Sequence, residues 1–187
     1  EKLQKSIDFV CSLVPKHISV YILKIEDGTP FSKMELSMPS DEEIEKQYLF
    51  CANVLESRGY YQYEISNFAK AGFESRHNLK YWNCEEYLGI GPAAHSFLSG
   101  KRFYYPRDIK AFMDGCATIP DGDGGTQDEY IMLRLRLCEG IIFKEYEKLY
   151  GALSENFSQT AKRLEKLGLV SVFDDRIKKK KKGFLLS

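Results

Sequence analysis

Apolar and polar positions in the first third of the chain predict a strand, a helix and a second strand in that order. Residues 17–25 form a nearly continuous apolar and β-branched run, typical of a strand covered on both faces. Ser40 and Glu43 form a capping box, and an apolar stripe at helical spacing continues from it to Gly59. Residues 60–65 predict the second strand. This alternation implies right-handed parallel crossovers and hence an α/β sheet or barrel.

Both ends of the chain suggest a piece of a longer protein. The sequence begins with Glu1 rather than Met and enters directly into an amphipathic helix. The stripe of that helix consists of Leu3, Ile7, Val10, Cys11 and Val14, before Pro15. Residues 183–187 read like the opening of a further element, so we expect a fragment.

The middle of the chain predicts shorter strands. Residues 87–97 form a strand-like run interrupted by Gly89 and Gly91, which we expect to allow a bulge or a close backbone approach to a bound molecule. Residues 102–105 predict another strand, and a helix follows Pro106.

The stretch from Asp121 to Gly125 is composed like a linker and predicts a domain boundary. The expected domains are residues 1–120, which contain the α/β sheet or barrel, and residues 121–187. In the second domain, a capping box of Thr126 and Glu129 opens the first of three helices, and a hairpin is expected around Asp174. Three small helices and a hairpin predict a winged-helix-like α+β domain.

Composition excludes several classes of partner and metal site. Twenty-seven basic residues balance twenty-seven acidic ones, so no overall charge attracts nucleic acid or an anionic membrane. The apolar runs are too short to span a membrane, and we expect a cytoplasmic protein. Five scattered cysteines without a CxxC pair argue against a disulfide framework and against a self-contained zinc or iron–sulfur site.

Two further segments match binding motifs but lack the sequence context that those motifs require. Gly89 to Ala94 matches a dinucleotide-binding fingerprint, but a strongly apolar strand before it and a long helix after it are missing. The five lysines at 178–182 suggest nucleic acid, yet residues 121–187 hold 13 basic and 11 acidic residues. A solvated wing explains the lysines better.

Residues 63–97 are the strongest candidate for a functional site. They contain the only tryptophan, Trp82, and two of three histidines, His77 and His95. One interpretation makes His77 a metal or haem ligand, with Tyr81 and Trp82 stacking on a flat macrocycle. The other has His77 and Asn78 hydrogen-bond a loop while Tyr81 and Trp82 fill a core. His17 has no expected role, and Glu64 is expected to meet a polar ligand.

Several blocks of the chain resemble one family in order. They are HISVYILKIEDGTPF, YEISNFAKAGFESRHNLKYW, YLGIGPAAHSF, LRLRLCEGI and LEKLGLV. These are similar to the radical S-adenosylmethionine family of oxygen-independent coproporphyrinogen III oxidases. The HNxxYW block beginning at His77 is similar to the haem-chaperone branch of that family. The resemblance covers nearly the whole chain, and it implies that residues 1–120 are the C-terminal strands and helices of a partial (β/α) radical SAM barrel.

The resemblance implies a set of site residues and cofactors. His77 would be the haem-iron ligand, with Asn78, Tyr81 and Trp82 shaping its surroundings, while His95 and Lys24 would lie near S-adenosylmethionine. The family holds its 4Fe-4S cluster by a CxxxCxxC motif that this sequence lacks. The cluster and S-adenosylmethionine are therefore expected only in a full-length protein, and this chain alone should not catalyse radical chemistry.

Three functions follow from these observations. The first is a haem chaperone that binds haem and delivers it to an acceptor protein. The second is a coproporphyrinogen III oxidase that decarboxylates its substrate in porphyrin synthesis, and the third is a winged-helix interaction module. The expected partners are haem or a porphyrin, a haem acceptor, transient contact with a membrane or respiratory protein, and a second copy through a truncated sheet edge.

Overall fold

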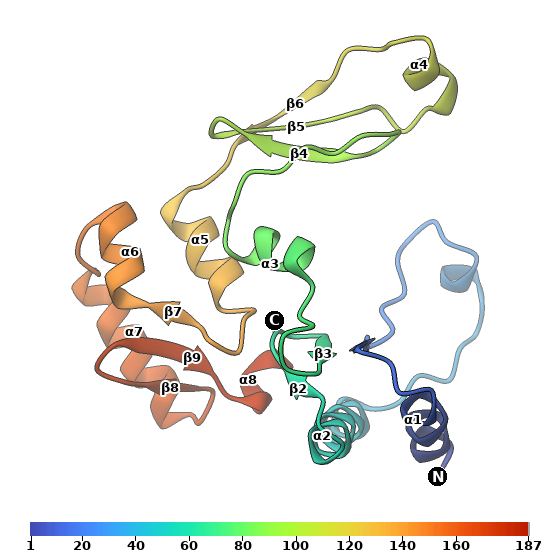
Figure 1. Cartoon of the computed structure of the whole chain (residues 1–187), viewed down its shortest axis with the longest axis vertical. Coiled ribbons are helices and arrows are strands. Elements are labelled where there is room, and N and C mark those ends of the chain that lie inside the picture. Colours follow the sequence, from blue (N-terminus) through green and yellow to red (C-terminus); the bar gives the residue numbers. More distant parts are fainter. Residues whose placement is uncertain (187) are drawn as a thin grey trace.

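The computed structural model describes residues 1–186 and shows a mixed α/β chain with three three-stranded sheets (Figure 1). The first elements are α1 Lys2–Ser12, β1 His17–Ser19, the 3-10 helix η1 Phe31–Lys33, α2 Asp41–Ser57, β2 Tyr61–Gln62, β3 Asn67–Ala69 and α3 Arg76–Trp82. An antiparallel arm follows, with β4 His95–Leu98, β5 Lys101–Tyr104, α4 Ile109–Met113 and β6 Ile119–Asp123. The last elements are α5 Gln127–Arg134, β7 Ile141–Ile142, α6 Phe143–Tyr150, α7 Glu155–Lys166, β8 Val170–Val172, β9 Arg176–Lys179 and α8 Lys181–Phe184. No helix within residues 1–186 is long and apolar enough to cross a membrane.

The first sheet has the strand order β1-β3-β2, and each neighbouring pair is antiparallel. Phe68 of β3 pairs with Ile18 on one side and Gln62 on the other. The expected strands before and after α2 therefore run in the same direction, but the return strand β3 lies between them. The two strands are thus parallel, as the expected crossover requires, and the short β2–β3 hairpin places β3 between them.

Helices α1 and α2 pack on this sheet and form its core. The cluster consists of Ile7, Ile18, Cys51, Ala52, Leu55, Tyr60 and Phe68. The predicted capping box of α2 is confirmed, since Glu43 N–H donates to Ser40 Oγ at 3.3 Å and Ser40 N–H donates to Glu43 Oε2 at 2.9 Å. Val14, expected on the stripe of α1, lies beyond the helix with φ +51° and is exposed.

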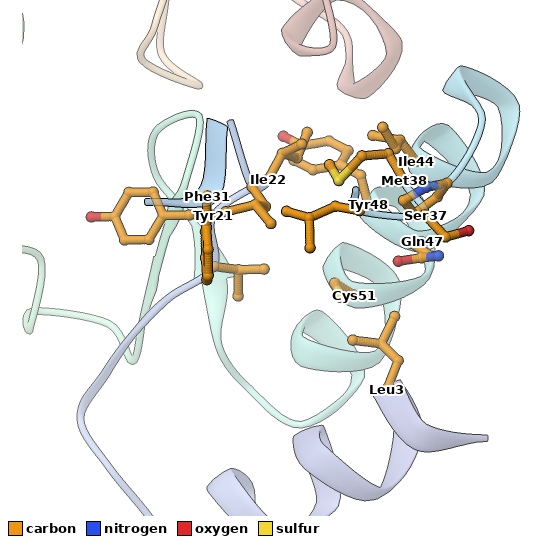
Figure 2. Close-up of a pocket in the computed structure, with 14 residues that line it drawn as sticks. Leu3, Tyr21, Ile22, Phe31, Ser37, Met38, Ile44, Gln47, Tyr48 and Cys51 are labelled. Atoms are coloured by element: carbon orange, nitrogen blue, oxygen red, sulfur yellow. The ribbon is translucent and has the colours of Figure 1, made fainter. Parts of the chain in front are cut away.

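The predicted strand over residues 17–25 is shorter than expected. Only His17–Ser19 pairs as a strand, and Tyr21, Ile22 and Leu23 are exposed. A cavity of about 450 Å³ lies against this segment, and Figure 2 shows its lining side chains coming from α1, α2 and the chain after β1. The apolar run was expected to be a strand covered on both faces, but its side chains at residues 21–23 are exposed.

The arm of β4, β5 and β6 projects from the rest of the molecule (Figure 1). The strand expected over residues 87–97 is limited to β4 and an isolated bridge between Tyr87 and Phe97. Asp121–Asp123 was expected in a linker but belongs to β6, which pairs with β5. A Cβ on Gly89 would lie 2.2 Å from the carbonyl oxygen of His95, so this glycine allows a close approach of the chain to itself.

The three expected C-terminal helices and the hairpin β8–β9 are present, and β7 adds a third strand in the order β7-β9-β8. The core is formed by Tyr130, Ile141, Tyr146, Ala161, Val170 and Ile177. Thr126 caps α5, but the carboxylate of Glu129 accepts the N–H of Gly125 at 2.7 Å and also binds Arg102. The second half of the expected capping box is therefore replaced by a contact to the arm.

Only the first two lysines of the run at 178–182 belong to the hairpin expected as a wing, because β9 ends at Lys179 and α8 begins at Lys181. Lys181 Nζ lies 2.6 Å from Glu56 Oε2 and 3.0 Å from Asn53 Oδ1, both on α2, and Lys182 lies 3.8 Å from Glu45. The end of the run instead docks α8 onto α2.

A short backbone pairing joins the first sheet to the C-terminal elements. Ile65 N–H donates to the Arg136 carbonyl at 2.9 Å, Cys138 N–H donates to the Tyr63 carbonyl at 2.9 Å, and Glu64 and Leu137 form an antiparallel bridge. We call this contact, residues 63–65 with 136–138, the junction.

We predict that the exposed segment after β1 promotes association between copies, because an apolar strand edge is a template for pairing. Ile22→Lys should lower the weight-average mass that sedimentation velocity gives across a protein concentration series. Met113→Lys, at an exposed apolar position on α4, is the matched control and should leave association unchanged. A wild-type chain that stays strictly monomeric would contradict this prediction.

Candidate functional site

The segment that contains the HNxxYW block folds as α3, whose N-terminal end is fixed to the first sheet. Ser75 caps the helix, and its Oγ accepts the N–H of Asn78 at 3.3 Å. The hydroxyl of Tyr63 accepts the N–H of Ser75 at 3.3 Å and lies 2.9 Å from Nε2 of His17. His17, for which no role was expected, is therefore one of the groups that position α3.

His77 lies in the first turn of α3 and is exposed. Its Nε2 is 2.7 Å from the hydroxyl of Tyr81, and the two rings meet edge to face with centroids 4.8 Å apart. The spacing of four residues explains the contact, because such residues lie on the same face of a helix. The structure thus presents an imidazole at the surface with its orientation fixed by one phenol.

Tyr81 is the first in a series of polar and aromatic side chains that contact one another and extend to the arm and to α5. The rings of Tyr81 and Tyr87 are 4.5 Å apart and nearly perpendicular. Arg102 donates to the hydroxyl of Tyr87 at 3.2 Å and to the carboxylate of Glu129 at 2.9 Å. These groups line a cavity of about 190 Å³, smaller than the roughly 300–1,000 Å³ of ligand pockets. A macrocycle would therefore have to lie on the surface beside His77.

Asn78 and Trp82 hold the helix rather than surround His77. Burial raises the pKa of Tyr63, and a hydrogen bond with the Asn78 side chain opposes that rise. Trp82 is half-buried, with the guanidinium carbon of Arg136 5.0 Å from its ring centroid. Of the four residues expected around a haem, the structure brings only His77 and Tyr81 into direct contact.

His95 and Lys24 lie on other parts of the fold than α3, namely on β4 and in the segment between β1 and η1. His95, on β4, stacks on Tyr104 with centroids 4.9 Å apart, and its Nδ1 is 3.4 Å from Asp121. Lys24 lies in the exposed segment after β1 and pairs with Glu26 at 3.2 Å. Their expected place near S-adenosylmethionine stays a prediction.

A buried polar group at the junction was not anticipated from the sequence. Glu64 is 1 % exposed, and burial raises the pKa of its carboxyl. Its Oε1 accepts the N–H of Ser66 at 3.1 Å, whereas Oε2 finds no hydrogen-bond partner among residues 1–186. Arg136 lies near enough to oppose the rise in the pKa of Glu64, and its own Nε is also without a partner within that range. Alternation along the expected strand places the side chain of Glu64 on the face opposite to Tyr61 and Tyr63. Only the pairing of residues 63–65 with 136–138 explains why that side chain is buried.

The cysteines do not form a donor set for an iron–sulfur cluster. All five are free thiols, and within the described chain no three His, Cys, Asp or Glu side chains are grouped to hold a metal ion. Burial and the carboxylate of Glu64 raise the pKa of Cys138 to about 12, which disfavours the thiolate that a metal requires. The residues present therefore do not fit a 4Fe-4S cluster.

Comparison with known proteins identifies the C-terminal unit first. Residues 128–186 match the HemN C-terminal domain. In the solved structures, the chain matches the coproporphyrinogen III oxidase HemN of Escherichia coli, a radical SAM enzyme, with a TM-score of 0.68 and 18 % identity. That match covers 96 % of this chain and 48 % of the enzyme, and it shows the fold.

Curated relatives are more similar in sequence. The haem chaperone HemW of Bacillus subtilis is 36 % identical over 181 residues, which is 90 % of this chain and 48 % of HemW. A mitochondrial radical S-adenosyl methionine domain-containing protein of Danio rerio is 37 % identical over 130 residues, covering 67 % of this chain and 25 % of that protein. The chain spans about half the length of the HemW proteins it matches.

These matches confirm the resemblance predicted from the sequence blocks. Residues 128–186 match the HemN C-terminal domain, and the chain as a whole is similar to haem chaperones HemW and to a radical S-adenosyl methionine domain-containing protein.

The buried carboxyl of Glu64 predicts a specific pH dependence of stability. Because its pKa is raised on folding, the unfolded chain loses this proton first as the pH rises above about 4.5, and Glu64 then lowers the free energy of unfolding. Glu64→Gln removes this loss, so the stability of the variant relative to wild type should rise between pH 4 and pH 7 in urea unfolding. Glu42→Gln, at an exposed position on α2, is the control. Parallel pH profiles for wild type and Glu64→Gln would contradict the assignment.

Proposed function

We propose that this chain carries the haem-binding helix of a haem chaperone, with His77 as the axial ligand of the iron. The observation that carries the proposal is the exposed imidazole of His77 on α3, held by the hydroxyl of Tyr81. Neutral imidazole is a common ligand of haem iron, and a neighbouring aromatic ring provides an apolar contact for the porphyrin. Haem is here the cargo, and its iron would replace Tyr81 as the partner of the ring nitrogen.

The open position of His77 favours a carrier over an enzyme that encloses its substrate. The cavity next to α3 is about 190 Å³, so haem on His77 would keep one face accessible to water or to another protein. An acceptor could then approach that face before the iron leaves His77. A buried haem would first require the protein to open.

The alternative of a coproporphyrinogen III oxidase has less support. The likeness to HemN is one of fold, whereas the curated relatives at 30–36 % identity include haem chaperones HemW. The winged-helix interaction module has no observation in its favour beyond the three helices and hairpin. The haem acceptor, a membrane or respiratory partner and the cytoplasmic location stay predictions.

The proposal is tested by titrating haem into the purified chain and into His77→Ala. Wild type should bind one haem per chain and give a Soret band that reports an axial ligand in both oxidation states. His77→Ala should lose that ligand spectrum and bind at least about tenfold more weakly, equivalent to about 1.4 kcal/mol. His95→Ala, an exposed histidine on the separate arm, is the control and should behave as wild type. An unchanged spectrum in His77→Ala would exclude His77 as the ligand.

A second prediction concerns the iron–sulfur cluster. Because the five cysteines are dispersed over the fold, anaerobic reconstitution with iron and sulfide should leave no stoichiometric 4Fe-4S absorption. Quantifying iron and sulfide per chain after gel filtration provides the measurement. One stable cluster per chain would contradict the prediction.

A further inference from the structure

The helix that carries His77 is too short to be stable without help from its neighbours. α3 has seven residues, and isolated helices shorter than about 12–15 residues are marginal in water. Its N-terminal end is fixed by Tyr63 through Ser75. The orientation of the whole helix therefore depends on what holds its C-terminal end.

That end is held by a buried arginine of α5. Arg134 is 4 % exposed, and its Nη1 donates to Oδ1 of Asn83, the C-terminal cap of α3, at 2.5 Å. Its Nε donates to the carbonyl of Gly140 at 3.0 Å, and its Nη2 donates to Glu139 at 3.0 Å. All three nitrogens are engaged, so the planar guanidinium has one orientation and fixes the position of Asn83.

A second contact, from the segment directly after α5, supports the first. Arg136, two residues further on, places its guanidinium over the ring of Trp82 at 5.0 Å, a cation–π distance. The backbone of Arg136 also belongs to the junction, through its carbonyl and the N–H of Ile65. Trp82 and Asn83 are thus held by two arginines whose positions are set by the C-terminal unit.

We propose that Arg134 is a positioning residue for haem binding: through Asn83 it orients α3, and so places His77, without contacting haem itself. The C-terminal unit, residues 128–186, then forms part of the haem site although His77 lies outside it. This inference rests on the proposed function. It assigns to the C-terminal unit control over the affinity for haem.

The test uses variants of Arg134 and Asn83 in the whole chain. Arg134→Met keeps the length of the side chain and removes the donors, Asn83→Ala removes the acceptor, and the double variant completes a cycle. Arg163→Met is the control, because Arg163 is an exposed arginine on α7 of the same C-terminal unit. Far-UV circular dichroism verifies that each variant folds. If Arg134→Met does not fold, Asn83→Ala alone tests the positioning role.

Two measurements separate positioning from a general loss of structure. Trp82 is the only tryptophan, so its emission maximum and its quenching by acrylamide report the contact between α3 and α5 directly. Haem titration gives the affinity and the axial-ligand spectrum. We expect Arg134→Met and Asn83→Ala each to increase quenching of Trp82 and to weaken haem binding about tenfold. The double variant should be no weaker than either single one, and Arg163→Met should match wild type.

The outcomes distinguish the two proposals. If wild type binds haem through His77 and both variants keep its affinity and spectrum, the positioning role is wrong and the proposed function stands. Additive losses in the double variant would also overturn it, since the two residues would then act independently. If wild type shows no haem binding that depends on His77, the proposed function fails and the inference falls with it.

Discussion

The junction between residues 63–65 and 136–138 is the contact on which the arrangement of the molecule depends. Two backbone hydrogen bonds and the bridge between Glu64 and Leu137 join the first sheet to the segment after α5. Because backbone groups pair only in a fixed register, this contact sets the position of α5 relative to Tyr63. Since α3 is held by Tyr63 at one end and by Arg134 at the other, the junction also determines where His77 lies.

The junction buries a carboxyl group whose hydrogen bonds are incomplete among the described residues. Glu64 is buried with one carboxylate oxygen unpaired within residues 1–186, and an unsatisfied buried polar atom typically costs about 1–3 kcal/mol. Arg136 provides partial electrostatic compensation. Further contacts between α8 and α2, formed by Lys181 with Glu56 and Asn53, hold the same two parts together. The C-terminal unit is thus attached both to the first sheet and to α2, and the junction is the attachment next to the candidate site.

Local features of the fold were predictable from sequence, and partners distant in sequence were not. The capping box of Ser40 and Glu43 and the C-terminal helices depend on residues within a few positions of one another. The central position of β3, the strand at Ile119–Asp123 and the docking of Lys181 depend on contacts with remote segments. Glycine and aspartate made residues 121–123 look like a linker, because composition does not reveal that β5 offers them a pairing edge.

The candidate site shows the same contrast between contacts local in sequence and contacts distant in sequence. The contact between His77 and Tyr81 was not predicted, although their spacing of four residues places both on one face of a helix. The roles of His17, Arg134 and Arg136 could not be predicted, since each reaches α3 from another element.

The most direct test of the account is a crystal structure of the chain loaded with haem, with anomalous data collected at the iron edge. The account predicts one iron peak per chain, within bonding distance of a ring nitrogen of His77 and on the surface beside Tyr81. A single well-occupied iron position away from α3, such as one in the cavity between α1, α2 and the chain after β1, would contradict it.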